Sequence, residues 1–314
     1  MRFASIITGL VAIAQASPLT KRASTSDAAT VGYATQNGGT TGGKGGKVTT
    51  VTTLAALQSA AAGDTAGIVI ISGTISGAGN VKVGSNKSII GAKGSKVVGI
   101  GFTIKAVKNV IIRNVVVSKV LAANGDAIAL NKATNVWVDH VDVSSDVAHD
   151  KDYYDGLIDV THACDWVTIS NSFIHDHWKS SLVGHSDSNG AEDKGHLTVT
   201  YANNYWSNTH SRGPSFRFGT GHVFNNYYEN VSDGINTRKG AQLLVESNAF
   251  TGSSKPLYSV GNDGFAVATD NDFGGESNTA PKGTLTKVPY TYTKLGAANV
   301  KSGVVGVAGA TLSF

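Results

Sequence analysis

The sequence contains few residues that can form disulfides, restrict the backbone or carry charge. Among its 314 residues are one cysteine, five prolines and one methionine, and 15% of the residues are charged. One cysteine excludes an intramolecular disulfide, and the low charge without long heptads argues against a coiled coil. The 38 glycines follow no three-residue period, which excludes collagen. The chain is 41% hydrophobic, too apolar for a disordered protein, so we expect an ordered body rich in strands and turns.

The N-terminus predicts a secreted protein. Arg2, the apolar stretch 6–13 and the Ala14-Gln15-Ala16 triplet are typical of a signal peptide over residues 1–16. The apolar stretch is too short to span a bilayer, so no membrane anchor is expected. The dibasic pair Lys21-Arg22 predicts a short propeptide over residues 17–22. A single domain would then occupy residues 23–314.

Removing this leader changes the charge of the protein. The first 22 residues hold three cations and no acid, so 23 basic residues face 22 acidic ones afterwards and the formal charge falls from +4 to +1. Such a balance does not favour nucleic acid as a partner. Any anionic ligand must therefore be held by a local cluster of cations. Two sequons, at Asn86 and Asn230, are candidate glycosylation sites, and Cys164 is expected to be a buried, inert thiol.

A repeat runs through the chain at short apolar segments that end in Asn or His. Aligning these segments places one column of residues at steps of 23, 26, 31, 33, 22, 22 and 23: Gly91, Asn114, His140, Asn171, Asn204, Asn226, Asn248 and Asn271. Repeats of about 22–23 residues without helical periodicity are typical of a solenoid, and the Leu pattern of leucine-rich repeats is absent. The pattern predicts an all-β, single-stranded parallel β-helix with Asn at one corner of each rung. A helix near residues 53–62 would cap its N-terminal end.

Acidic residues gather where the repeat is lengthened. Asp155 and Asp159 are four residues apart, which places them on one face of an extended strand, and Asp126 begins the preceding rung. Three unpaired carboxylates repel one another, so a cation is expected between them, and hard oxygen ligands favour calcium. Solvated acids in turns are the alternative interpretation.

Cations follow on the next rungs. Lys179 lies in HDHWKSSLVG, and Arg212 and Arg217 lie in RGPSFR. Together with the acids they could form a surface network of ion pairs. They could equally hold the carboxylates of a uronate polymer, because arginine binds carboxylates with two parallel hydrogen bonds.

These segments resemble a known family. VWVDH at 136–140, DGLID at 155–159, VTIS at 167–170, the lysine of HWKSSLVG and R-x-P-x-x-R at 212–217 are similar to family 1 polysaccharide lyases, and most of all to secreted fungal pectate lyases. The similarity runs from about residue 32 to residue 314. It implies a right-handed parallel β-helix and a monomeric, calcium-dependent enzyme that cleaves polygalacturonate by β-elimination.

The resemblance also implies a role for each site residue. Asp126, Asp155 and Asp159 would be calcium ligands, and Arg212 would be the base that removes the C5 proton. Lys179 and Arg217 would bind substrate carboxylates, while the Asp-His pair of VWVDH would be structural. Some relatives carry a second acid two residues before the Asp126 position; here that residue is an asparagine, so no additional ion is expected there.

Other functions make different demands on the sequence. A polygalacturonase on the same scaffold needs an acid and a base on either side of the bond, and the NTD and RIK motifs of that family are missing. A pectin lyase acts without calcium, and the three aspartates argue against that function. A noncatalytic carbohydrate-binding β-helix leaves the R-x-P-x-x-R segment unexplained. A zinc site at His162, Cys164, His175 and His177 matches no usual zinc spacing.

Overall fold

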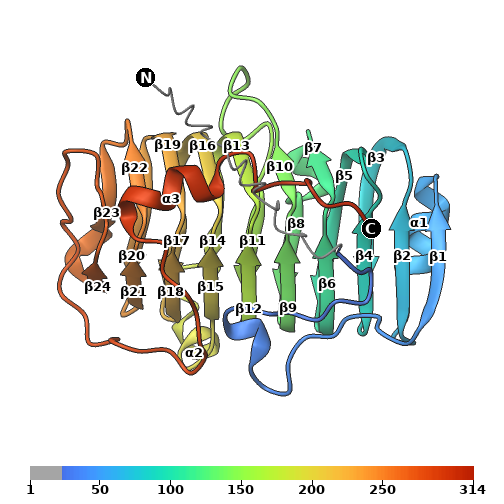
Figure 1. Cartoon of the computed structure of the whole chain (residues 1–314), viewed down its shortest axis with the longest axis horizontal. Coiled ribbons are helices and arrows are strands. Elements are labelled where there is room, and N and C mark those ends of the chain that lie inside the picture. The colour runs from blue at the N-terminus through green and yellow to red at the C-terminus, as the bar shows by residue number, and fades with distance from the viewer. Residues whose placement is uncertain (1–22) are drawn as a thin grey trace, which may run out of the picture.

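The computed structural model describes residues 23–314, so the predicted signal peptide and propeptide lie outside the described residues. The described chain winds into a parallel β-solenoid whose rungs stack side by side along the long axis (Figure 1). Every pairing between the named strands is parallel, as in residues 134–139 against 165–170. The predicted parallel β-helix is therefore confirmed.

One sheet of ten strands, which we call sheet A, forms the first side of the solenoid. Its strands are β1 (Lys47–Val51), β2 (Gly67–Ile71), β4 (Lys87–Gly91), β6 (Lys108–Arg113), β9 (Thr134–Asp139), β12 (Asp165–Ser170), β15 (Thr198–Ala202), β18 (Thr220–Phe224), β21 (Gln242–Glu246) and β24 (Phe265–Thr269). Each lies one rung beyond the last, because the chain visits two further sides before it returns.

Those two further sides belong to one bent sheet, sheet B, joined through the long strand β5 (Lys96–Lys105), which also pairs with β3 (Thr74–Val83). Limb 1 of sheet B consists of β7 (Val116–Ser118), β10 (Asp142–Ser144), β13 (Phe173–Lys179), β16 (Tyr205–Ser211), β19 (Tyr227–Val231) and β22 (Ala249–Thr251). Limb 2 consists of β8 (Ile128–Asn131), β11 (Ile158–Thr161), β14 (Leu182–Val183), β17 (Ser215–Arg217), β20 (Asp233–Arg238) and β23 (Lys255–Ser259).

The core is a set of apolar columns that run along the solenoid. The strand register of sheet A aligns residues of successive rungs, so that side chains of like shape stack on one another. One fully buried column comprises Ile89, Ile112, Val138, Ile169, Tyr201, Val223 and Val245. Because each strand is covered on its inner face by the other two sides, β-branched residues dominate these positions.

At the corner after sheet A, the predicted column of asparagines is wrong in part, because it combines residues from two adjacent columns. Residues with a left-handed backbone at this corner are Asn114, His140, Asn171, Asn203, Asn225, Ser247 and Asp270. The predicted column switched at Asn204 to the neighbouring position, where the side chains of Asn204, Asn226, Asn248 and Asn271 bond to one another. Two adjacent columns both favour asparagine, one for its left-handed backbone and one for its amide, so the doublets at 203–204 and 225–226 could be aligned either way.

A short helix covers the N-terminal end of the solenoid. The helix α1 (Leu54–Ala61), whose N-cap Thr53 accepts a hydrogen bond from the backbone N–H of Ala56, buries Leu57 and Ala61 against the first rungs, which confirms the predicted capping helix. The other helical segments are η1 (Tyr33–Thr35), η2 (Ala122–Asn124), α2 (Gly190–Asp193), η3 (Val260–Asn262) and α3 (Ala297–Val304). None of the described helices is long and apolar enough to cross a membrane.

Candidate functional site

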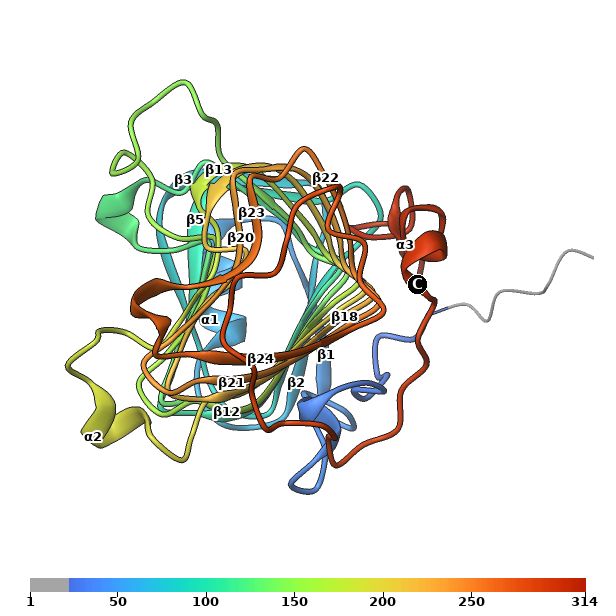
Figure 2. The same ribbon diagram turned by 90° about the vertical axis from the view of Figure 1, so that its left-hand side faces the viewer.

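The six residues predicted to form the site lie on successive rungs at limb 2 of sheet B. Asp126 precedes β8, Asp155 precedes β11, Asp159 lies within β11, Lys179 ends β13, Arg212 lies between β16 and β17, and Arg217 ends β17. The long loop between β10 and β11 stands out beyond one edge of this side, and the α2 segment stands out beyond the other (Figure 2). The two lengthened rungs thus flank the candidate site.

The acids are arranged differently from the expected strand face. β11 begins at Ile158, so Asp159 is a strand residue whereas Asp155 belongs to the end of the preceding loop. Asp126 lies opposite Gly156 rather than opposite Asp155, because the Gly156 N–H donates to its Oδ1 at 2.8 Å. The two aspartates of DGLID therefore approach Asp126 from a loop and from a strand.

Burial and mutual repulsion act on these acids. Burial, reinforced by the charge of Asp155, raises the pKa of Asp126 to about 6. Burial and the charge of Asp126 raise the pKa of Asp159 well above its usual range, although the Arg212 guanidinium opposes this shift. The ionised forms of these two carboxylates are thus poorly stabilised by the protein alone, which is the electrostatic condition that a bound cation relieves.

The cations lie directly beside the acids. Lys179 Nζ lies 3.2 Å from Asp155 Oδ1 and 3.2 Å from Asp152 Oδ1, an acid on the exposed loop. Arg212 Nη1 lies 3.8 Å from Asp159 Oδ2. Arg212 also has a left-handed backbone, with a φ of 64°, a conformation that costs a non-glycine residue free energy and is concentrated at functional sites. The local fold therefore holds the Arg212 side chain at this position against a conformational cost.

Arg217 is held by an acid that the sequence did not single out. Its Nε donates to Asp187 Oδ1 at 2.6 Å, and its Nη1 donates to the Gly184 carbonyl at 3.1 Å. Arg238, one rung further along limb 2, donates to the other oxygen of Asp187 at 2.8 Å. The loop between β14 and β15 thus places one carboxylate between two arginines.

The three aspartates suit a hard divalent cation. In each of them one oxygen is already engaged: Asp126 by Gly156 N–H, Asp155 by Lys179, and Asp159 by the Leu182 N–H at 2.9 Å. Among the described residues, the second oxygens of Asp126 and Asp155 receive no hydrogen bond, and that of Asp159 has only Arg212 at 3.8 Å. Calcium takes six to eight oxygen ligands and accepts such open, flexible sets.

The acids are not drawn together into a finished metal site. Across residues 23–314 no group of three or more His, Cys, Asp or Glu side chains is gathered closely enough to hold an ion by itself. The histidines weighed as zinc ligands have acidic partners instead: His162 pairs with Glu192 at 2.8 Å, and His175 with Asp142 and Asp176. Cys164 is buried, as expected, and burial raises the pKa of its thiol to about 12.

Comparison with known proteins identifies the family. A family model described as "Pectate lyase" matches residues 1–313. A probable pectate lyase A of Aspergillus niger is 63% identical over 315 residues, covering 99% of this chain and 97% of the relative. Pectate lyase A of Emericella nidulans is 60% identical over 296 residues, covering 94% of this chain and 90% of the relative.

The chain belongs to the pectate lyase family.

Solved structures of pectate lyases share the fold. The crystal structure of a pectate lyase from Bacillus sp. N165 in complex with trigalacturonate superposes with a TM-score of 0.81 at 31% identity, covering 90% of this chain and 98% of that chain. A pectate lyase variant from Xanthomonas campestris gives a TM-score of 0.78 at 28% identity, covering 90% and 98%. The family membership and the predicted enzyme class are thus confirmed together with the solenoid.

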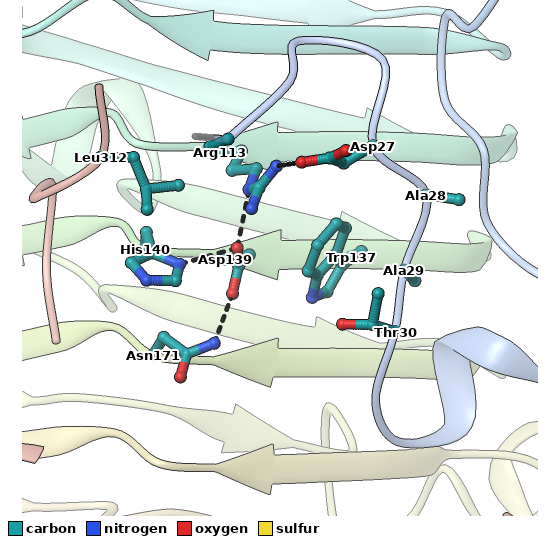
Figure 3. A pocket seen from close by; sticks show the side chains of 11 residues that line it. Asp27, Ala28, Ala29, Thr30, Arg113, Trp137, Asp139, His140, Asn171 and Leu312 are labelled. Carbon is teal, nitrogen blue, oxygen red and sulfur yellow. Dashed lines mark hydrogen bonds and ion pairs between the residues drawn. The ribbon is translucent and has the colours of Figure 1, made fainter. Parts of the chain in front are cut away.

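The VWVDH segment of this pectate lyase lies on another side of the solenoid. Asp139 ends β9 in sheet A, is fully buried, and accepts hydrogen bonds from Arg113 Nε at 2.8 Å and Asn171 Nδ2 at 2.8 Å, with His140 Nδ1 at 2.7 Å (Figure 3). Although burial opposes it, these partners hold the pKa of Asp139 below its usual range. The surrounding pocket, about 460 Å³, lies between residues 23–30 and Leu312. Arg113 also pairs with Asp27 at 2.9 Å, so the network ties residues 23–30 to the solenoid.

Three residues of the site region were missed from sequence. Asp152 and Asp187 hold the predicted cations, and His177 was considered only as a zinc ligand. His177 is 1% exposed, and burial lowers its pKa to about 4, so its imidazole is neutral at physiological pH. The lengthened steps of the repeat could have indicated the two loop acids, because they mark the rungs that carry long loops.

Proposed function

We propose that this member of the pectate lyase family is a secreted, monomeric, calcium-dependent enzyme that cleaves de-esterified (1→4)-α-D-galacturonan by β-elimination. The observation that carries the proposal is the meeting of three incompletely satisfied carboxylates with Lys179 and Arg212 on adjacent rungs. A family relative whose crystal structure contains trigalacturonate supports the substrate class.

Binding is assigned to the acids and to two of the cations. Asp126, Asp155 and Asp159 would hold calcium through their open oxygens. Lys179 and Arg217 would bind uronate carboxylates; each already pairs with an aspartate carboxylate, which supports this assignment. Exchange of a protein carboxylate for a substrate carboxylate conserves the ion pair.

The chemistry is assigned to Arg212. In its neutral form, which a bound calcium ion and neighbouring cations would favour, Arg212 would accept the C5 proton, which lies α to the uronate carboxylate. The bond from C4 to the glycosidic oxygen then breaks, the departing oxygen takes a proton from solvent, and a 4,5-unsaturated uronide is released. Bound calcium would supply neutralisation of that carboxylate and stabilise the charge that develops during proton removal. Lys179 would hold the uronate unit that reacts in position beside Arg212. The elimination needs no attacking water.

Digestion of polygalacturonate tests this function. In calcium the protein should generate product with the ultraviolet absorbance of a conjugated double bond, and EDTA should abolish it until calcium is restored. Reducing ends formed without that absorbance would show hydrolysis and contradict elimination. Product formed equally in EDTA would contradict the calcium assignment, and activity confined to methyl-esterified chains would indicate a pectin lyase instead.

A further inference from the structure

One buried imidazole joins both ends of the loop that carries Asp155. His177 lies in β13, with Nδ1 against the hydroxyl of Ser145, where the loop begins, and Nε2 at 2.6 Å from the carbonyl oxygen of Asp155, where it ends. Between these two points the residues from 148 to 153 are exposed. The ring therefore joins the two ends of this loop, beside the buried Tyr154, whose hydroxyl donates to Asp146 Oδ2 at 2.9 Å.

The partners determine how the ring is protonated. A carbonyl oxygen only accepts hydrogen bonds, so Nε2 must carry the hydrogen and donate to Asp155. In the neutral ring Nδ1 is then an acceptor, and the Ser145 hydroxyl donates to it. Both ring nitrogens are thus satisfied within the protein, and the imidazole is fixed in one tautomer and one orientation.

Neighbouring residues of β13 hold the same loop further out. Trp178 Nε1 donates to the His149 carbonyl at 2.7 Å, and Lys179 Nζ contacts Asp152 and Asp155 at 3.2 Å each. Of these contacts, only the one from His177 acts on the backbone of a predicted metal ligand. It lies where the chain turns from the loop toward β11, so it limits rotation of the peptide that directs the Asp155 carboxylate.

We propose that His177 is a positioning residue for the calcium site, which it preorganises by holding the backbone of Asp155. The inference rests on the proposed function in one respect, the assignment of Asp155 as a calcium ligand. Groups that orient metal ligands typically change metal affinity by roughly 10- to 100-fold when they are replaced. His177 does so through the main chain of the ligand rather than through its carboxylate.

A matched pair of substitutions separates this role from general packing. In His177→Gln the terminal amide extends as far as the original Nε2 and can donate to the Asp155 carbonyl. In His177→Asn the amide is one methylene shorter, so it can engage Ser145 but cannot reach Asp155. Both changes place an amide in the same buried position, so a merely structural role predicts similar effects from both.

Calcium chloride titrated into each folded variant by calorimetry gives the decisive comparison. We expect His177→Asn to weaken calcium binding by roughly tenfold or more and His177→Gln to stay within about threefold of the native protein. Ser145→Ala, which keeps the Asp155 contact, should also stay within about threefold. Loop amides at 146–154 should exchange with deuterium faster in His177→Asn than in His177→Gln, a readout that requires no activity.

The outcomes distinguish failure of the His177 role from failure of the calcium assignment. Equal calcium affinity in the asparagine and glutamine variants, while the native protein binds calcium, would overturn the role of His177 alone. A native protein that binds no calcium would overturn the metal assignment and this inference with it. If His177→Asn does not fold, Ser145→Ala and His177→Phe take its place. The proposal is supported if Ser145→Ala keeps native loop exchange and calcium affinity while His177→Phe binds calcium more weakly and regains activity in excess calcium. Failure of excess calcium to restore the activity of His177→Phe would overturn it.

Discussion

The asparagine ladder makes a quantitative prediction about stability. Asn226 is fully buried; its Nδ2 lies 2.9–3.0 Å from Asn248 Oδ1 and from the carbonyls of Tyr201 and Phe224, and its Oδ1 accepts two hydrogen bonds from Asn204 at 3.0 Å each. An amide nitrogen has two hydrogens, so three acceptors share two donations, and the side chain contributes the equivalent of four bonds. At about 1 kcal/mol net for each bond, Asn226→Ala should cost about 4 kcal/mol.

Urea unfolding measures this cost. The variant should unfold at a lower urea midpoint with an unchanged m-value, because about 4 kcal/mol is a large part of the 5–15 kcal/mol typical of native proteins. Asn299→Ala is the control, since Asn299 is exposed and its amide bonds only to the Leu295 carbonyl, and it should stay within about 0.5 kcal/mol. A loss below about 1 kcal/mol at Asn226 would refute the idea that the ladder stabilises the rungs, because the buried partners would then have found other bonds.

Four further predictions follow from single contacts. Arg212→Lys should lower kcat at least 100-fold at saturating substrate, as loss of a base does, and near-native activity would contradict the assigned role. Asp187→Asn should lower KM for polygalacturonate at low salt because it releases Arg217, an effect that high salt should weaken; a raised KM would mean that Asp187 positions the arginine. Expression in a glycosylating host should give a mass loss for Asn230→Gln and none for Asn86→Gln, since Asn230 is exposed whereas Asn86 Nδ2 donates to the Asp64 carbonyl at 3.0 Å. The pKa of buried His222 is lowered from 6.5 to about 4, so the unfolded chain binds this proton first and stability should fall as pH drops from 6.5 to 4; His222→Gln should flatten that part of the profile, and an unchanged slope would contradict it.

The fold could be predicted because each rung repeats the same physical demand. Apolar columns and left-handed corners recur at similar spacing, so the repeat is visible without knowledge of any contact. The exact register was not visible, since Asn203 and Asn204 satisfy two different columns with the same residue type. Distinguishing them requires the backbone angle of one and the side-chain bond of the other, and neither is written in a local sequence pattern.

That the candidate site residues lie close together could be predicted from the sequence, but their individual contacts could not. The acids and cations were found because rung neighbours lie far apart in sequence at known steps. Asp152, Asp187 and His177 were not found, because their contacts depend on the paths of two lengthened loops that follow no period. Asp155 shows the same limit: its separation of four from Asp159 suggested a shared strand, whereas the strand begins only at Ile158.

The charges around limb 2 explain why cations alone do not make this surface a receptor for a polyanion. In the ion-pair network there, six basic residues face six acidic ones and leave no net formal charge: Lys151, Lys179, Arg212, Arg217, Arg238 and Lys239 against Asp126, Asp152, Asp155, Asp159, Asp187 and Asp263. A polymer carboxylate that displaces Asp152 or Asp187 exchanges one ion pair for another, and such exchanges nearly cancel in free energy. A divalent cation at the aspartates would turn the formal charge to +2 and relieve the repulsion between them. Under the proposed function, net attraction for an anionic polymer would therefore come from the metal, and the arginines and the lysine would determine where along the rungs each carboxylate is placed.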